Sequence, residues 1–421
     1  MADYVFLDPG ADVTRRDVYR RGRELGMRVV LVSRRVSWET DQIDDWIEAD
    51  PTDPAQVLSR TAGLRVAGVV NCSESCLEAA ALLAREHGVP GVSPEVAALC
   101  RDKIAMGNRL RAAEVPMARR YVLGDAREAG AAVHQVGVPG VLKPSTGVAS
   151  LYTVRFDSEA DLRARLDRFG EMITARVPAP LRGMRGRWVV EEYLDGPAFS
   201  VESVVSGSTP AHVAVCAKGD TEGPFFREVG HSTPPGLAPD VLAELFDLTG
   251  RAIGALGIED CVTHTEFKVT AAGPRMLEIA ARMGGGSIRQ VVLAATGTDL
   301  LEATLRFAMG QRPEATPSQR GAAASRSWYP DRAGRLRRMD AEALARLPGI
   351  VAVNRWMAEG ELYELPPDGY REVCGVVATG TSAGAAVRLA ESALEIARDH
   401  ELVVLDPVGS PARTGGNGRL R

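Results

Sequence analysis

Residues 261–286, CVTHTEFKVTAAGPRMLEIAARMGGG, decide the fold of this chain. Two runs rich in apolar and β-branched residues, 261–269 and 274–281, lie on either side of Ala-Ala-Gly, which is the pattern of a β-hairpin. Gly273 stands third in this loop, where hairpins of that length place a left-handed residue. The stretch therefore predicts two antiparallel strands joined by a three-residue turn.

The three-residue turn predicts which residues of the two strands face each other. It pairs Thr270 with Pro274 and, counting back along both strands, Glu266 with Glu278. Their Cβ atoms would then lie about 5 Å apart on one face. Because bare carboxylates repel at that distance, we expect a divalent cation between them, Mg²⁺ or Mn²⁺. A four-residue loop would instead place the two glutamates on opposite faces, and a shifted register would leave them facing solvent.

Basic residues near this hairpin and upstream of it suggest a phosphate site. Arg282 precedes three glycines, which combines a fork of donors with close backbone approach to an anion. Lys143 ends the predicted strand 138–143 before a loop of small residues, a place suited to a phosphate as well as to a solvated charge. This order of groups points to Mg-ATP chemistry, although the chain contains no Walker GxxxxGK[ST] motif.

Lysine is rare in this chain, since 46 of its 50 basic residues are arginine. An Arg-rich composition explains the rarity, yet ammonium and guanidinium groups are not interchangeable. The four lysines are therefore candidates for positions that need a compact charge. They are Lys103, Lys143, Lys218 and Lys268.

The composition is that of a water-soluble protein of two or three domains. The chain has 421 residues, 45% hydrophobic and 25% charged, and a formal charge of −5, so we expect neither nucleic-acid nor membrane binding. It has no apolar run long enough to span a membrane, and its start does not resemble a signal peptide. Six scattered cysteines, including Cys72 and Cys76, predict reduced thiols and a cytoplasmic location.

The chain begins with a pattern typical of a small parallel α/β domain, expected over residues 1–100. Short apolar strands alternate there with helices, such as the strand 66–71 and the helix 74–87. No G-x-G-x-x-G motif follows the first strand, which disfavours a dinucleotide-binding oxidoreductase.

Strands and helices continue in a mixed order after residue 100. The expected helices are 101–113, 125–136, 158–169 and 239–256, and the expected strands include 119–123, 187–194, 198–206 and 211–217. The polar stretch 218–239 is long for a connection and is a candidate lid. A third part is expected over 312–409, followed by a disordered tail at 410–421.

Six motifs in this order resemble the ATP-grasp superfamily, more narrowly its carboxylate–amine ligases of the L-amino-acid ligase (dipeptide synthetase) type. The motifs are GVPGVS at 88–93 before Arg-Asp-Lys, VLKP at 141–144, VVEEYLDG at 189–196, FREVGH at 226–231, THTEFK at 263–268 and EIAARMGGG at 278–286. The resemblance implies an α/β (α+β) ATP-grasp fold with subdomains at about 101–186 and 187–311.

The resemblance also implies an ATP site. It assigns Lys103 and Lys143 to the phosphates, with a loop through Ser150 closing over them. The hinge that reads adenine would be Glu191, Glu192 and Leu194. The family's ribose-contacting glutamate is replaced here by Ala198, so Glu202 is a substitute candidate.

The remaining implied roles concern the metal and the substrates. Glu266 and Glu278 match the magnesium ligands, although Ala280 replaces an asparagine often found nearby. Arg282 matches the arginine that stabilises the acyl phosphate. Residues implied in substrate binding are Glu74, Glu228, His231, Arg282, Gly285 and Gly286, with Gly286 suggesting a roomy pocket. A structural hydrogen bond is expected for His264.

The implied reaction is ATP-dependent amide formation through an acyl phosphate, releasing ADP and phosphate. The expected partners are a small carboxylate, such as an amino acid, and an amine or second amino acid, as in antibiotic-type metabolism; a homodimer is left open. The alternatives are an enzyme that activates bicarbonate or formate, and a non-catalytic ATP-binding protein on the same fold.

Overall fold

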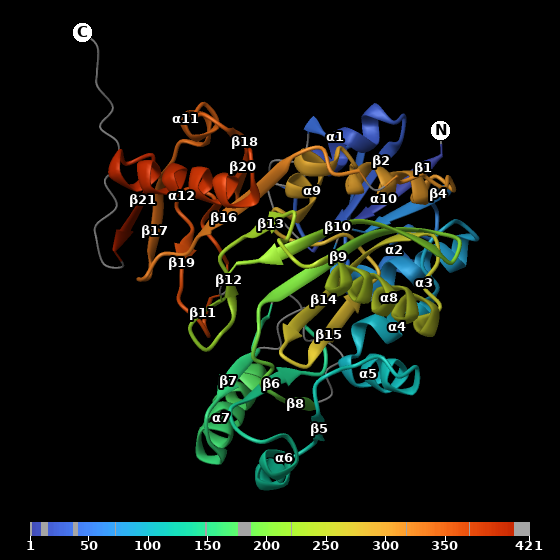
Figure 1. The fold of residues 1–421 in the computed structure, drawn as a ribbon. Coiled ribbons are helices and arrows are strands. Elements are labelled where there is room, and N and C mark those ends of the chain that lie inside the picture. The colour runs from blue at the N-terminus through green and yellow to red at the C-terminus, as the bar shows by residue number, and fades with distance from the viewer. Residues whose placement is uncertain are drawn as a thin grey trace.

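The computed structural model describes most of the chain (Figure 1). The described residues are 2–9, 16–36, 41–71, 73–147, 150–175, 187–219, 221–316, 318–369 and 371–407. Cys72 and the tail predicted to be disordered lie outside these ranges. The other five cysteines are buried. Among the described residues, no helix is long and apolar enough to cross a membrane.

The N-terminal part is the predicted parallel sheet with flanking helices. Its strands lie in the order β3-β2-β1-β4. The elements are β1 (Asp3–Leu7), α1 (Arg16–Glu24), β2 (Arg28–Ser33), β3 (Asp45–Glu48), α2 (Pro54–Thr61), β4 (Val66–Asn71), the short 3₁₀ turn η3 (Glu74–Cys76), α3 (Leu77–His87) and α4 (Pro94–Arg101). The sequence reading misses β3 because this half-exposed edge strand, Asp-Trp-Ile-Glu, has no apolar run.

A smaller lobe with an antiparallel sheet follows, shown in teal and green in Figure 1. Helix α5 (Lys103–Ala112) precedes the lobe and packs in the central core. The elements of the lobe are β5 (Arg120–Leu123), the turn η4 (Ala126–Glu128), α6 (Ala129–Val136), β6 (Gly140–Pro144), β7 (Val154–Phe156), α7 (Glu159–Ala175) and β8 (Trp188–Glu192). The strand order is β5-β8-β6-β7. Because β8 pairs with β5 and β6, the lobe's sheet extends past the subdomain division expected at residue 186.

The centre of the molecule is one antiparallel sheet of eight strands, in the order β15-β14-β9-β10-β13-β16-β20-β18. Its strands are β9 (Ala198–Ser206), β10 (Thr209–Lys218), β13 (His231–Thr233), β14 (Cys261–Thr270), β15 (Gly273–Ala280), β16 (Ala322–Trp328), β18 (Ile350–Arg355) and β20 (Cys374–Gly380). The helices that accompany it are α8 (Pro239–Leu256), α9 (Ile288–Thr296), α10 (Leu300–Ala308), α11 (Ala341–Ala345) and α12 (Ala383–Asp399). Three further strands form a small sheet in the order β19-β17-β21, namely β17 (Gly334–Met339), β19 (Leu362–Tyr363) and β21 (Val403–Pro407).

The large sheet runs across the boundary expected near residue 312. Strand β13 pairs with β10 on one side and with β16 on the other, so it joins the C-terminal strands to the strands of the β14–β15 hairpin. It also lies inside the stretch 218–239 predicted as a lid. Residues 231–233 are therefore fixed in a sheet, and only the short hairpin of β11 (Thr221–Glu222) and β12 (Arg227–Glu228) stands apart from it.

The β14–β15 hairpin pairs Glu266 with Glu278, as predicted, but by another route. The three-residue loop is wrong: Thr270 pairs with Gly273 across a two-residue turn, closed by the Thr270 hydroxyl, which donates to the Gly273 carbonyl oxygen at 2.9 Å. This turn alone would shift the register by one residue. A bulge at Leu277 compensates, because Phe267 pairs with Met276 while Glu266 pairs with Glu278.

Candidate active site

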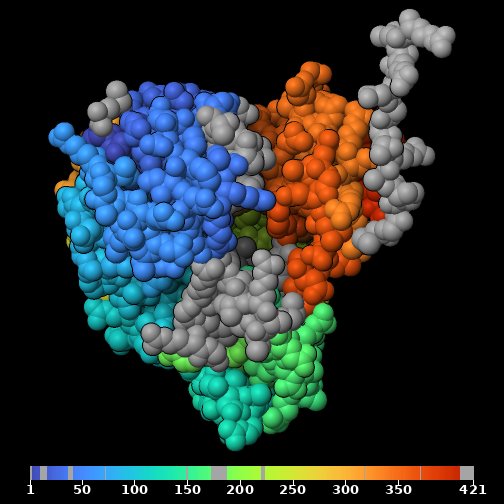
Figure 2. All heavy atoms as spheres, turned by 180° about the vertical axis from the view of Figure 1, so that it is seen from behind, coloured from blue at the N-terminus to red at the C-terminus, as the bar shows by residue number. Residues whose placement is uncertain are grey.

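A cavity of about 870 Å³ lies where the N-terminal part, the C-terminal part and the small lobe meet. Figure 2 shows the hollow between the N-terminal part in blue and the C-terminal part in orange. Its walls include Glu74 from the first part, Glu266 and Glu278 from the hairpin, and Tyr329 from the last part. A second cavity of about 120 Å³, lined in part by Lys143, shares both hairpin glutamates with it. The two cavities are therefore arms of one site.

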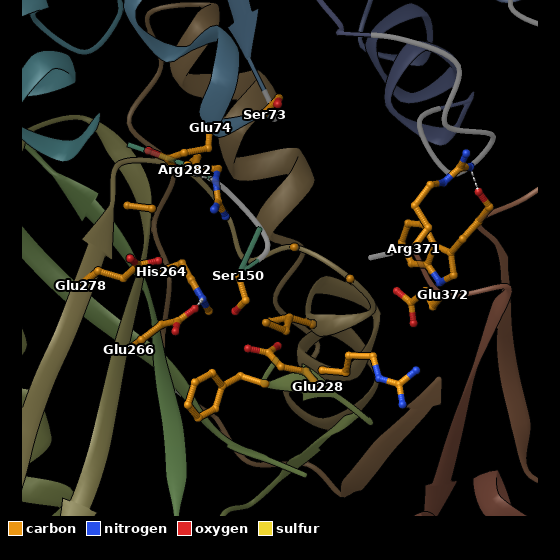
Figure 3. A pocket seen from close by; sticks show the side chains of 18 of the residues that line it. Ser73, Glu74, Ser150, Glu228, His264, Glu266, Glu278, Arg282, Arg371 and Glu372 are labelled. Carbon is orange, nitrogen blue, oxygen red and sulfur yellow. Dashed lines mark hydrogen bonds and ion pairs between the residues drawn. The ribbon is translucent and has the colours of Figure 1, made fainter. Parts of the chain in front are cut away.

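The paired carboxylates of Glu266 and Glu278 face this site (Figure 3). Lys103 and Lys218 line it beside them. Lys103 Nζ lies 2.8 Å from Glu278 Oε2, and Lys218 Nζ lies 2.7 Å from Glu266 Oε1. Burial raises the pKa of each carboxyl, but the nearby ammonium groups outweigh it, and both pKa values fall below the ordinary one. Both glutamates are thus ionised.

The oxygen donors of this pair fit a magnesium ion that is bound together with phosphates. Within the described ranges, no group of three or more His, Cys, Asp or Glu side chains is arranged to hold a metal. Magnesium commonly takes one or two protein carboxylates and completes its shell with water and nucleotide phosphates. Ala280 adds no ligand, which is consistent with such a shell.

The two lysines predicted to bind phosphates are brought together by the backbone. Lys103 begins α5, and its backbone N–H donates to the Ser145 carbonyl oxygen at 2.8 Å, just past the end of β6. Lys143 lies at that end of β6, with Nζ 2.6 Å from Glu191 Oε2. Burial lowers the pKa of Lys143, but the Glu191 charge outweighs it and the pKa is raised. Both side chains therefore offer positive charge to the small cavity.

The hinge predicted to read adenine lines the small cavity, but its glutamate side chains are already engaged. Glu191 pairs with Lys143, and the Glu192 carboxylate accepts hydrogen bonds from the Arg119 backbone N–H and guanidinium at 2.8 and 2.6 Å. Leu194 lines the cavity with an apolar side chain. If this segment reads adenine as predicted, recognition of the base would fall to backbone groups and to Leu194.

Ser150 lines both cavities and has a positive φ of 54°. Its neighbours Val148 and Ala149 lie outside the described residues, so closure of this loop over phosphates stays a prediction.

The structure places Glu202 away from both cavities, which contradicts the suggested ribose contact. Glu202 is fully buried in β9 and lines neither cavity, because its side chain lies beneath His264. His264 Nδ1 lies 2.6 Å from Glu202 Oε1, and Nε2 lies 2.9 Å from Glu266 Oε1. Burial lowers the pKa of His264, but the two carboxylates outweigh it and raise the pKa to about 9.

Arg282 lies at the cavity edge, held by a residue from the N-terminal part. Its Nε donates to Glu74 Oε2 at 2.9 Å, and its Nη1 donates to the Met283 carbonyl oxygen at 2.8 Å. Nη2 is the nitrogen that these two contacts leave for an anion. Glu74 is therefore placed beside Arg282, as a support for it.

Glu228 and His231 line the larger cavity and contact each other. His231 Nε2 lies 3.2 Å from Glu228 Oε2, and Lys218 Nζ lies 2.7 Å from Glu228 Oε1. Burial raises the pKa of Glu228, but the Lys218 charge outweighs it and lowers the pKa to about 2. Lys218 thus bridges Glu228 and Glu266. The sequence reading reached Lys218 only through the rarity of lysine.

The far wall of the larger cavity comes from the C-terminal part, which sequence reasoning did not assign to the site. Tyr329, Trp356 and Arg371 line it, and they belong to no motif that could have indicated them. On the opposite side, Gly285 and Gly286 line the same space. A Cβ added to Gly285 would meet nothing within 4 Å, so this turn leaves the cavity open.

Two stretches of the chain match protein-family models. Residues 136–290 match the ATP-grasp domain, and residues 326–396 match the L-amino acid ligase C-terminal domain 2. The crystal structure of an L-amino acid ligase from Bacillus licheniformis superimposes with a TM-score of 0.83, covering 97% of this chain and 99% of that one at 17% sequence identity. That likeness shows a shared fold.

Curated relatives are similar over part of their length. Human carnosine synthase 1 is 28% identical over 321 residues, which cover 72% of this chain and 39% of that protein. Alanine–anticapsin ligase of Bacillus subtilis is 24% identical over 281 residues, which cover 62% of this chain and 58% of that protein. The chain thus spans about two fifths of the length of carnosine synthase 1.

Proposed function

We propose that this chain couples ATP cleavage to amide bond formation. The premise is that it carries an ATP-grasp domain joined to the C-terminal domain of the L-amino acid ligases. The substrates would be an amino acid, as acyl donor, and an amine or second amino acid. The observation that carries the proposal is that ionised Glu266 and Glu278 share one cavity with Lys103 and Arg282.

The first step brings together two anions, the substrate carboxylate and the γ-phosphate of ATP. The positive charges of the site would offset their repulsion. A carboxylate oxygen of the acyl donor attacks the γ-phosphorus of ATP, the bond to ADP breaks, and an acyl phosphate forms. Lys103 and Lys143 would hold the phosphates, and Arg282 Nη2 would hold the transferring group, because fixed positive charge stabilises the developing negative charge. A magnesium ion between Glu266 and Glu278, when bound, would supply further neutralisation of the phosphate oxygens.

The second step needs an amine held close to the acyl carbon. The bound ammonium group first loses a proton to water and becomes a free amine. Its nitrogen then attacks that carbon, the bond to phosphate breaks, and the nitrogen loses a second proton to the released phosphate. Glu228 would bind the incoming ammonium group, since its carboxylate is ionised and lines the larger cavity. His231, 3.2 Å from Glu228 Oε2, would orient that carboxylate by a hydrogen bond.

The size of the cavity supports two organic substrates over a one-carbon acid. A volume of about 870 Å³ lies near the upper end of the range of small-molecule sites, about 300–1,000 Å³. Bicarbonate or formate would leave most of that space to water. The open turn at Gly285 and Gly286 supports a bulky second substrate, such as an intermediate of antibiotic-type metabolism.

The test is a pairwise screen of amino acids and amines for ADP release, with the products identified by mass spectrometry. We expect ADP release that depends on both substrates and a product mass equal to their sum less one water. ATP cleavage that depends on bicarbonate, with no amide in any pair, would refute the proposal in favour of the one-carbon alternative. Background ADP release with every pair and with bicarbonate would favour a non-catalytic ATP-binding protein.

A further inference from the structure

Two buried residues behind the paired carboxylates, Glu202 and His264, have no part in the reaction proposed above. They face each other directly on the neighbouring strands β9 and β14. His264 lies between two carboxylates, with Nδ1 2.6 Å from Glu202 and Nε2 2.9 Å from Glu266. Figure 3 shows the contact of His264 with Glu266. The three side chains thus form a chain of contacts from the interior of the sheet to the cavity wall.

Stability alone gives no account of Glu202. A carboxylate that is fully buried costs desolvation energy, and replacing a buried ion pair by apolar residues is often neutral or stabilising. What Glu202 does provide is a fixed acceptor for His264 Nδ1, which sets the orientation of the imidazole ring.

The contacts of Glu266 show what this orientation achieves. Lys218 Nζ and His264 Nε2 lie 2.7 and 2.9 Å from the same oxygen, Oε1. Oε1 is therefore held from two sides, and Oε2 is the oxygen left for a cation in the cavity. We propose that Glu202 and His264 are positioning residues that orient the Glu266 carboxylate for a divalent cation. This inference rests on the proposed function.

The same pair also supports the turn that follows Arg282. A Cβ built on Gly284 would lie 3.0 Å from Glu202 Oε2 and 3.0 Å from His264 Nδ1. Any side chain at residue 284 would therefore press on both positioning residues. Because residue 284 has no side chain, the turn after Arg282 can pack closely against Glu202 and His264. The same two residues also support the Glu266 carboxylate.

The experiment measures Mn²⁺ binding to the full chain in the presence of ADP, by electron paramagnetic resonance, without turnover. For Glu202→Gln and His264→Gln we expect Mn²⁺ affinity to fall about tenfold or more, because residues that orient metal ligands contribute 10–100-fold. The kcat at saturating metal should change much less. The matched control is His212→Gln: His212 Nδ1 lies 2.9 Å from Ser203 Oγ on adjacent strands of the same sheet, and this pair lines neither cavity.

The outcomes separate this inference from the proposed function. Unchanged Mn²⁺ affinity in both variants, with Glu266→Gln losing it, overturns the positioning role alone. Equal Mn²⁺ binding by the wild type and Glu266→Gln overturns the metal site as well. If Glu202→Gln fails to fold, as judged by its melting temperature, Gly284→Ala tests the contact between Glu202 and His264 instead, because its added methyl group would press on both side chains. It should weaken Mn²⁺ binding, and unchanged binding there would count against the inference.

Discussion

Replacing Arg282 should remove most of the catalytic rate while leaving substrate binding largely intact. The guanidinium Nε donates to Glu74 and Nη1 donates to the Met283 carbonyl oxygen, so one nitrogen, Nη2, is left for the reacting group of the proposed mechanism. Losing one such donor at a site of developing negative charge costs about 3–4 kcal/mol, or about 10²–10³-fold in kcat. We expect that loss for Arg282→Ala.

Two further variants test the geometry behind this estimate. Arg282→Lys keeps the positive charge, but a single ammonium group cannot contact Glu74 and the substrate at the same time, as the several nitrogens of a guanidinium can. The kcat of this variant should therefore stay well below that of the wild type. Glu74→Gln should lower kcat by a smaller factor, and in Arg282→Ala the same change should have little further effect, because the two residues act as a unit.

The assay is steady-state ADP release with the substrate pair found by the screen, measured alongside melting temperature. The matched control is Arg275→Ala on strand β15, which ends two residues before Arg282. The Arg275 guanidinium donates to the neighbouring Pro274 carbonyl oxygen and lines neither cavity. This control should turn over normally. A kcat for Arg282→Ala within fivefold of the wild-type value would refute the role given to this arginine.

Three other substitutions give distinct signatures. Glu278→Gln removes one of the two carboxylate ligands, so the Mg²⁺ concentration for half-maximal rate should rise at least tenfold; an unchanged Mg²⁺ titration would contradict the metal site. Lys143→Met should raise the KM for ATP by about tenfold or more, since it removes a buried ammonium from the phosphate arm, and equal ATP affinity in a direct binding measurement would speak against this. Gly285→Trp should fill the open turn and abolish turnover of the bulkiest amines while sparing the KM for ATP, and an unaltered amine profile would argue that the acceptor binds elsewhere.

The sequence predicts the ATP-grasp fold and the facing pair Glu266 and Glu278, but it does not predict how that pair is built. Counting residues assumes a regular ladder, and the wrong loop length was offset by a bulge at Leu277. Neither the two-residue turn nor the bulge has a local sequence pattern strong enough to predict it. The pairing survived because the two deviations cancel.

Long-range contacts account for the other differences. Glu202 looks like a pocket residue along the chain, but its burial depends on the β9–β14 register, which only the folded sheet defines. The role of Lys218 depends on its ion pairs with Glu228 and Glu266, which lie 10 and 48 positions away in sequence. Motifs on single segments indicate many of the residues that line the cavities, whereas side chains that connect segments carry no sequence pattern of their own.

The pairing of β13 with β16 has a practical consequence for protein engineering. Exchanging the C-terminal part between related ligases is an obvious way to change acceptor preference, with the loop near residue 312 as the natural cut. A chimera cut there would have to rebuild hydrogen bonds along Ser232–Thr233 and Ala323–Ala324, and a truncated chain would expose that strand as an open edge prone to aggregation. Chimeras that keep β16 of the original chain, and exchange only the segments after it, preserve the pairing of β13 with β16.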